Sequence, residues 1–223
     1  MIRFPLLLLA LSLFASTPSA QIASLPPVDE GASDPSFIAF RSQLLAAAAA
    51  RDTSAVLRAF APTATISFGA EFSGADGVRE VWLSGLVPRE PGDDLWSALV
   101  ETVSLGSTVR SGVTSAPYYF MGFPEGLDPF EHVIVVAEEV RVRSEPSLQG
   151  TVLGSLNYEV VPTAYSPEVN QVEADGYTWI PIRLATGERA WIAQRFVRSP
   201  LGLRAGFEKV NGRWTILYFV AGD

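Results

Sequence analysis

Two neighbouring stretches, VRVRSEPS at residues 140–147 and TVLGSL at residues 151–156, decide the fold of the second half of the chain. Alternating β-branched residues on either side of a turn that contains Pro146 are typical of two short strands. Further short apolar runs follow at residues 159–162, 179–184, 187–192 and 196–197. Strands this short cannot form a sheet alone, and closure would remove their exposed edges. The sequence therefore predicts a small all-β barrel over residues 132–199.

The same pattern resembles the bacterial SH3-like (SH3b) domain over about residues 134–199. Members of that family open with V-x-V-R-x-x-P-S, continue with V-[IL]-G-x-L, and close with a W-x-x-V strand, a glycine turn and a G-W-V strand. The matching positions here are Val140, Val142, Arg143, Pro146, Ser147, Val152, Leu153, Gly154, Leu156, Trp179, Ile182, Gly187, Trp191 and Ile192. Two departures stand out: Ala190 replaces the usual glycine, and the loop from Ser166 to Asp175 is longer than usual.

A hairpin signal closes the chain. Asn211-Gly212 separates an apolar run at residues 203–210 from another at residues 213–220, and both turn residues tolerate positive φ. This register predicts that Phe207 faces Ile216 and that Lys209 faces Trp214. Tyr218 is expected on the same face as these four residues, with Leu217 and Phe219 on the other face. A hairpin that is apolar on both faces needs cover on both sides.

The end of the chain, from Gly206 to Leu217, is also similar to the closing strands of cone-shaped α+β domains of the nuclear-transport-factor-like type. Residues 33–131 fit such a domain, with helices first and extended segments afterwards. Asp34 is expected to cap a helix that has Pro35 at its first position, and either Asp52 or Thr53 is expected to cap a second short helix. Asp93 and Asp94 are expected to cap the start of a later helix. We therefore expect the hairpin at residues 200–223 to complete the sheet of the 33–131 domain, with the barrel inserted between them. The full arrangement resembles a group of exported bacterial proteins that are named only for their SH3-like domain.

The first twenty residues read as a secretory signal peptide. Arg3 precedes an apolar run from Phe4 to Phe14, and a stretch of small residues ends at Ala20, after which cleavage is expected. The run is too short for a comfortable membrane span. We expect a periplasmic or secreted protein with no membrane span, preceded after cleavage by a mobile leader at residues 21–32.

The net charge and the counts of cysteine and histidine limit which partners the chain can bind and which metal sites it can form. The formal charge is −8, which argues against nucleic-acid and anionic-membrane partners. The chain has no cysteine and one histidine, His132, so disulfides and thiolate ligands are excluded and a zinc site would lack ligands. We expect no metal and no cofactor, and a structural or surface role for His132. The acidic pairs are interpreted as caps or solvated residues, and no catalytic residues are assigned.

Aromatic side chains give the candidate binding residues. In SH3-like barrels, aromatics near loops often form a shallow groove, and the candidates here are Tyr158, Tyr165, Tyr177, Trp179 and Trp191. The alternative is that Trp179 and Trp191 belong to the core. In the N-terminal domain a cone pocket is an open possibility, and its candidate lining residues are Trp82, Tyr118, Tyr119 and Phe120, for which core packing is the alternative.

The sequence favours a binding module over an enzyme. The first hypothesis is an exported envelope protein whose barrel recognises a peptide, peptidoglycan or a protein partner. The second is a small-ligand-binding or enzymatic pocket in the α+β domain, with the barrel as an accessory. The third is a purely structural envelope protein.

Overall fold

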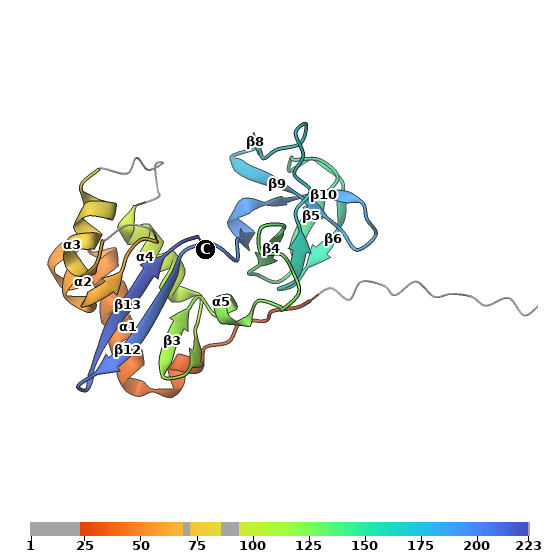
Figure 1. Ribbon diagram of the computed structural model, residues 1–223. Coiled ribbons are helices and arrows are strands. Elements are labelled where there is room, and N and C mark those ends of the chain that lie inside the picture. The colour runs from red at the N-terminus through yellow and green to blue at the C-terminus, as the bar shows by residue number, and fades with distance from the viewer. Residues whose placement is uncertain (1–22, 69–71, 86–93, 223) are drawn as a thin grey trace, which may run out of the picture.

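The computed structural model describes residues 23–68, 72–85 and 94–222, which form a mixed α+β fold with three sheets (Figure 1). Two separate apolar cores divide the fold into two units. The helix–sheet unit contains the helices and five strands from both ends of the chain. The two-sheet unit contains the strands between residues 132 and 198. The expected signal peptide lies outside the described residues.

The helices of the helix–sheet unit begin where capping residues occur. Asp34 accepts a hydrogen bond from the backbone N–H of Ser36 at the start of α1 (Pro35–Ala49). Asp52 caps α2 (Thr53–Ala59), and Asp94 caps α4 (Leu95–Ser104). The cap at Asp34 is confirmed, Asp52 rather than Thr53 is the cap of α2, and Asp94 is the cap of α4, whereas Asp93 lies outside the described residues. The shorter helical pieces are η1 (Glu30–Ser33), α3 (Gly74–Val78), the π-helical turn η2 (Arg79–Leu83) and α5 (Tyr119–Gly122).

The sheet of this unit is built around the C-terminal hairpin. Its strands are β1 (Phe60–Thr65), β2 (Thr108–Arg110), β3 (Val113–Ala116), β12 (Arg204–Val210) and β13 (Arg213–Val220), in the order β1-β13-β12-β3-β2. β1 runs parallel to β13, and the other neighbours are antiparallel. The hairpin therefore lies inside the sheet that the N-terminal strands begin.

A β-bulge changes the register of the hairpin halfway along. Phe207 pairs with Ile216 as expected, but Gly206 pairs with Tyr218, so Leu217 is the extra residue on β13. Because each inserted residue reverses the alternation of faces, Phe219 joins Phe207 on the core face and Tyr218 turns to the other face. The sequence-based assignment of Tyr218 and Phe219 was wrong for this reason.

The ring of Tyr218 covers Gly206, its partner on β12. The Tyr218 hydroxyl hydrogen-bonds with Ser115 Oγ at 2.8 Å. A Cβ atom on Gly206 would lie 2.0 Å from Cε1 of Tyr218. The ring therefore occupies the space of a side chain at position 206, an arrangement known from aromatic rescue of strand glycines.

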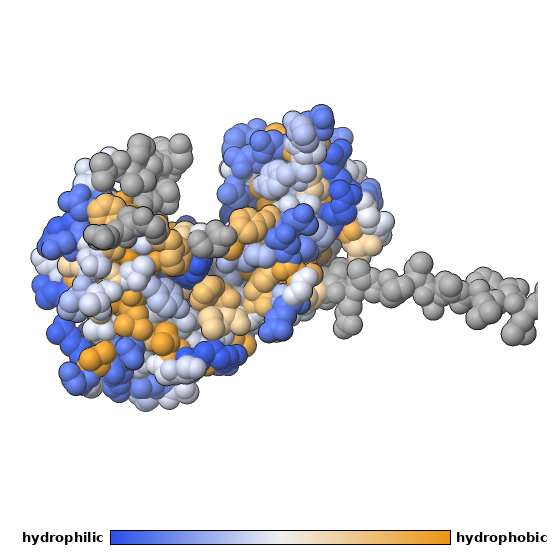
Figure 2. All heavy atoms as spheres, in the orientation of Figure 1, coloured by the Kyte–Doolittle hydropathy of each residue, from blue (hydrophilic) through white to orange (hydrophobic). Residues whose placement is uncertain are grey.

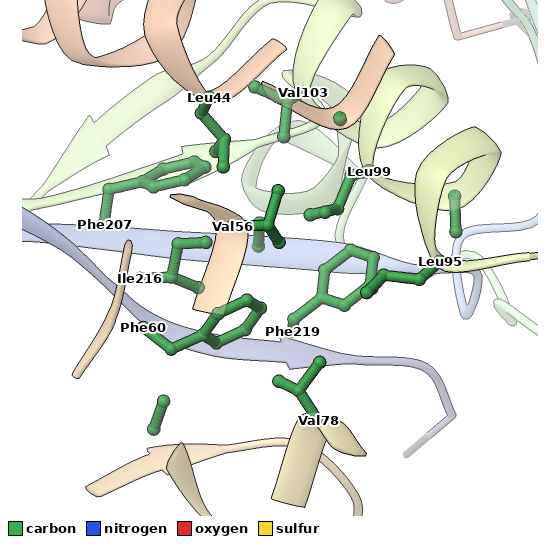
Figure 3. Close-up of a cluster of buried hydrophobic side chains, with 14 of the residues drawn as sticks. Leu44, Val56, Phe60, Val78, Leu95, Leu99, Val103, Phe207, Ile216 and Phe219 are labelled. Atoms are coloured by element: carbon green, nitrogen blue, oxygen red, sulfur yellow. The ribbon is translucent and has the colours of Figure 1, made fainter. Parts of the chain in front are cut away.

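The core of the helix–sheet unit lies between the sheet and the helices (Figure 3). Figure 3 shows Leu99 and Leu95 from α4 approaching Phe219 of the sheet. Phe37 of α1 meets Phe207 edge-on, with ring centroids 5.4 Å apart. Since each fully buried side chain of this size contributes about 1.5–3 kcal/mol, the hairpin is an integral part of this core.

The two-sheet unit consists of short strands on one apolar core. β6 (Val152–Leu156), β5 (Val140–Arg143), β10 (Arg189–Ala193), β9 (Tyr177–Arg183) and β8 (Val172–Ala174) form a five-stranded sheet in that order. β11 (Val197–Arg198), β4 (His132–Val135) and β7 (Val160–Pro162) form a three-stranded sheet. The 3₁₀ turn η3 (Gln194–Phe196) connects β10 to β11.

The expected closed barrel is not formed. Within residues 132–198, all of which the structure describes, the strands remain in two sheets that end at β6 and β8 and at β7 and β11. The long loop at residues 166–175 contains β8, which takes the edge of β9 at residues 177–179. Beyond it, the segment after β7 forms only an isolated bridge, between Thr163 and Ile182. At one corner the two sheets approach each other, where the N–H of Ala164 donates to the carbonyl of Pro181 at 2.9 Å.

Residues 23–30, which we call the N-terminal strap, contact both units. They belong to the segment that the sequence predicts to be a mobile leader. At one end, the N–H of Leu25 donates to the carbonyl of Tyr158 at 2.7 Å and the N–H of Val160 donates to the carbonyl of Ala23 at 2.8 Å. At the other end, the carbonyl of Val28 accepts from the N–H of Ser107. The described part of the leader is thus hydrogen-bonded to the two-sheet unit and to the helix–sheet unit.

A small third cluster lies beneath the strap, at the junction of the units. Its buried members are Tyr118, Tyr119, Ile134 and Val160, and Leu25 packs against them. The Tyr118 hydroxyl donates to the carbonyl of Leu25 at 2.9 Å. Burial raises the pKa of Tyr118 to about 12. The units are therefore joined by packed side chains as well as by the chain itself.

Asp29 anchors the strap electrostatically, which leads to a first prediction. Its carboxylate accepts two hydrogen bonds of 2.7 Å from Arg41 and one from Ser107 Oγ, and the Arg41 contact lowers the pKa of Asp29 despite partial burial. A lowered pKa means that this stabilisation is present above the ordinary carboxyl pKa and is lost as the pH falls through the lowered value. We expect Asp29→Asn to lower the free energy of unfolding at pH 7 by about 1–3 kcal/mol.

The measurement is urea denaturation followed by circular dichroism at pH 7 and at pH 3. Asp76→Asn is the matched control. Asp76 also forms an ion pair with an arginine, Arg79, but the side chain of Asp76 is 94% exposed. The two variants are expected to differ clearly at pH 7 and much less at pH 3. Equal stabilities of the two variants at pH 7 would show that the Asp29 anchor contributes nothing measurable.

Candidate functional site

A concave surface lies where the two units meet. Three neighbouring hollows share the same two lining residues, Arg198 and Ser199. We call the three hollows together the junction groove. Figure 2 shows an indentation of the surface between the two units. The largest of the three has a volume of about 550 Å³ and is lined from α4 by Glu101 and from the two-sheet unit by Tyr177 and Arg195.

Arg198 lines all three hollows of this groove. Its Nη1 donates to the carbonyls of Val197 at 2.9 Å and of Arg195 at 3.1 Å, which ties the guanidinium to the η3 turn. Its Nη2 lies 3.7 Å from Oε2 of Glu101. This ion pair connects β11 of one unit with α4 of the other. The groove therefore depends on both units for its walls and for its charges.

Tyr119 contributes a buried phenol to the smallest hollow, which has a volume of about 140 Å³. Burial raises the pKa of Tyr119 above its ordinary value, and the nearby charge of Arg198 opposes the increase. The phenol consequently stays protonated throughout the physiological range, where it can donate a hydrogen bond.

The structure brings together some of the predicted aromatics. Tyr177 and Trp179 lie on one face of β9 with ring centroids 6.0 Å apart. Trp191 pairs with Pro181 of β9. Because directly opposite residues share a face, Trp191 lies on the same face as Tyr177 and Trp179. It does not line the junction groove. Trp179 is only 2% exposed, and its Nε1 donates to the carbonyl of Ala174 at 3.0 Å. The long loop thus covers Trp179 and leaves Tyr177 in the groove.

The other two candidates lie apart from this pair. Tyr165 is 47% exposed and lines the third hollow together with His132 and Phe130. The Nδ1 atom of His132 is 2.9 Å from the carbonyl oxygen of Asp128. Tyr158 lines none of the three hollows and lies at the N-terminal strap, where its carbonyl accepts a hydrogen bond from the N–H of Leu25. The five candidates therefore do not form one surface.

The candidates for a cone pocket are also separated. Trp82 packs on Phe219 at 5.3 Å in the core of the helix–sheet unit, whereas Tyr118 and Tyr119 belong to the junction cluster. Phe120 lies beneath Arg204, whose guanidinium carbon is 4.8 Å from the ring centroid. A separate groove of about 420 Å³ does exist between α1, α2 and the tip of the hairpin, and Trp214 lines it.

Sequence reasoning missed the arginines. Arg195 and Arg198 face the groove because of η3 and β11, and neither takes part in the motif that carries the family resemblance. In the described ranges, no three side chains of the metal-binding types lie together. The helices of the described residues include none that is long and apolar enough to cross a membrane. Comparison with family models, with curated proteins and with solved structures found no match for the chain.

Proposed function

We propose that this chain is an exported, non-catalytic cell-envelope protein whose two-sheet unit is an SH3-like module that binds a peptide, the peptide stems of peptidoglycan, or a protein partner. The interior positions of the module support this assignment. Val140, Val142, Leu156 and Ile192 match the family motif and are all buried in one core. In this proposal, the two unclosed sheets and the added strand β8 are variations on the SH3-like fold.

We further propose that the helix–sheet unit is of the cone-shaped, nuclear-transport-factor-like type. Helices that pack against the sheet and a closing strand with Trp214 fit that architecture. In this proposal the unit serves mainly to supply one wall of the binding site.

The junction groove is the observation that carries the proposed function. An extended peptide needs a concave track with aromatic faces and hydrogen-bonding groups. The groove offers Tyr177 beside Arg195, and Ser199 and Arg198 lie at the meeting point of its three hollows. A surface made of two units also gives a binding module a larger contact area than its small strands supply.

A pull-down of the mature protein on purified sacculi tests this proposal. We expect Tyr177→Ala to weaken binding about fivefold or more, because truncation of an aromatic anchor commonly costs over 1 kcal/mol. Val152→Ala is the matched control, since Val152 is 47% exposed on β6 and lines none of the three hollows. Unchanged binding by Tyr177→Ala would contradict the groove as the site. Failure of the parent protein to bind sacculi or any envelope protein would favour the purely structural hypothesis.

A further inference from the structure

Arg195 is held in place by two aromatic rings. Its guanidinium carbon lies 4.7 Å from the ring centroid of Tyr177 and 4.5 Å from that of Phe196. Contacts of this kind attract the cation and restrict a side chain that otherwise samples many rotamers. The groove therefore contains a guanidinium whose orientation is fixed before any ligand arrives.

The hydrogen-bonding edge of this guanidinium is available. Among the residues that the structure describes, no carboxylate lies within ion-pair distance of Arg195, and its side chain donates no hydrogen bond to another residue. Arg41, Arg110 and Arg198, by contrast, are all paired with acidic residues. A planar guanidinium with free N–H groups matches the two oxygens of a carboxylate in a bidentate arrangement.

Arg198 acts as a positioning residue for Arg195. Its hydrogen bond to the carbonyl of Arg195 stabilises the η3 turn from which the side chain of Arg195 projects. The same guanidinium is 3.7 Å from Glu101, which partly neutralises it. The hollow thus combines two guanidinium groups with one carboxylate, and this balance fits a ligand with a single negative charge.

The geometry points to Arg195 as the receptor for one carboxylate group of a peptide ligand, with Tyr177 and Phe196 as its supports. This inference rests on the proposed function, because it names the chemical group that the junction groove recognises. A doubly charged phosphate fits less well, since Glu101 lines the same hollow. The carboxylate can come from a free peptide C-terminus or from an acidic side chain, and both present the same pair of oxygens.

The test is a titration of the ¹⁵N-labelled mature protein, followed by amide chemical shifts, with three probes. They are N-acetyl-trialanine with a free C-terminus, its C-terminal amide, and an amidated N-acetyl peptide that carries one glutamate side chain. We expect binding by the first or the third probe, and at least tenfold weaker binding by the neutral amide, as for the loss of a charge-assisted hydrogen bond. Which of the two acidic probes binds more tightly identifies the source of the carboxylate.

Variants connect the binding to Arg195. Arg195→Gln is expected to weaken binding of the acidic probe by about tenfold or more, and Arg195→Lys to restore only part of it because an ammonium lacks the planar fork. Arg189→Gln, an exposed position on β10 outside the groove, is the control for a general loss of charge. Circular dichroism confirms that each variant is folded.

Each outcome bears on the inference. Equal binding by Arg195→Gln and the parent, tighter binding of the neutral amide, or stronger competition by inorganic phosphate than by acetate would overturn it. If Arg195→Gln still binds sacculi as the parent does, the carboxylate assignment fails while the proposed function stands. If the parent binds neither sacculi nor any probe, both fail.

Discussion

Gly206→Ala is expected to lower the free energy of unfolding by about 2–3 kcal/mol, as overpacking of a well-packed site does. The new Cβ atom would lie 2.0 Å from Cε1 and 2.3 Å from Cζ of Tyr218. The ring must therefore leave its place, and its hydrogen bond with Ser115 is lost. Backbone strain is not the cause of this loss, because Gly206 is not one of the glycines with a positive φ.

A double-mutant cycle with Tyr218→Ala isolates this clash. Removal of the ring leaves space for the new Cβ atom, so Gly206→Ala should cost much less in the Tyr218→Ala background than alone. Urea denaturation at equilibrium measures all four proteins, and a coupling of about 1 kcal/mol or more is expected for residues in direct contact. Strictly additive effects would mean that the bulge does not place the ring over position 206.

Gly106→Ala is expected to be the second large change, because it displaces the N-terminal strap. Gly106 has φ +75°, and a Cβ atom there would lie 2.3 Å from the carbonyl oxygen of Val28. That carbonyl accepts the hydrogen bond from Ser107. A positive φ alone costs a non-glycine residue roughly 1–2 kcal/mol, and the clash with the strap adds to it.

The chain provides a control that separates the two contributions. Gly112 has φ +83°, and a Cβ atom there would meet nothing within 4 Å. Gly112→Ala therefore measures the backbone cost alone, and Gly106→Ala should be less stable than it by about 1–2 kcal/mol. Limited proteolysis within residues 23–30 should accelerate only for Gly106→Ala. If the two variants behave alike in both measurements, the close approach of strap and glycine is unimportant.

Local features of this fold were predictable from sequence because their causes are local. The caps at Asp34, Asp52 and Asp94 depend on a side chain and an N–H two or three residues away. The outer half of the hairpin follows from Asn211-Gly212 in the same way. The bulge at Leu217 has a distant cause, because the sheet positions of Gly206 and Ser115 determine where Tyr218 can lie.

The candidate site was predictable only in part. Tyr177 follows from the family pattern, since it precedes the tryptophan of a recognisable strand. The burial of Trp179 depends on β8, a strand formed by the loop that departs from the pattern. Arg195 belongs to the site because it stacks on the ring of Tyr177, and Arg198 because it pairs with Glu101 of the other unit. Such long-range pairings leave no periodic signal along the chain.

The parallel pairing of β1 with β13 has a consequence for the order of folding. β1 belongs to the first part of the chain, whereas β13 is its last strand, and the ribosome synthesises these segments far apart in time. The helix–sheet unit consequently cannot complete its core until β13, which contributes Ile216 and Phe219 to that core, has been made. The strands of the two-sheet unit end at residue 198, and its core contains no residue of the final hairpin.

Early folding of the two-sheet unit would also bring the late strands towards their partners. β4 and β11 pair with each other, so the folded unit holds its entry and exit close together. The 87 residues between β3 and β12 then behave as a loop of about 20 residues, and this roughly fourfold shortening lowers the entropic cost of closure by about 1.2 kcal/mol. The inserted unit can thus act as an internal folding aid for the unit that surrounds it.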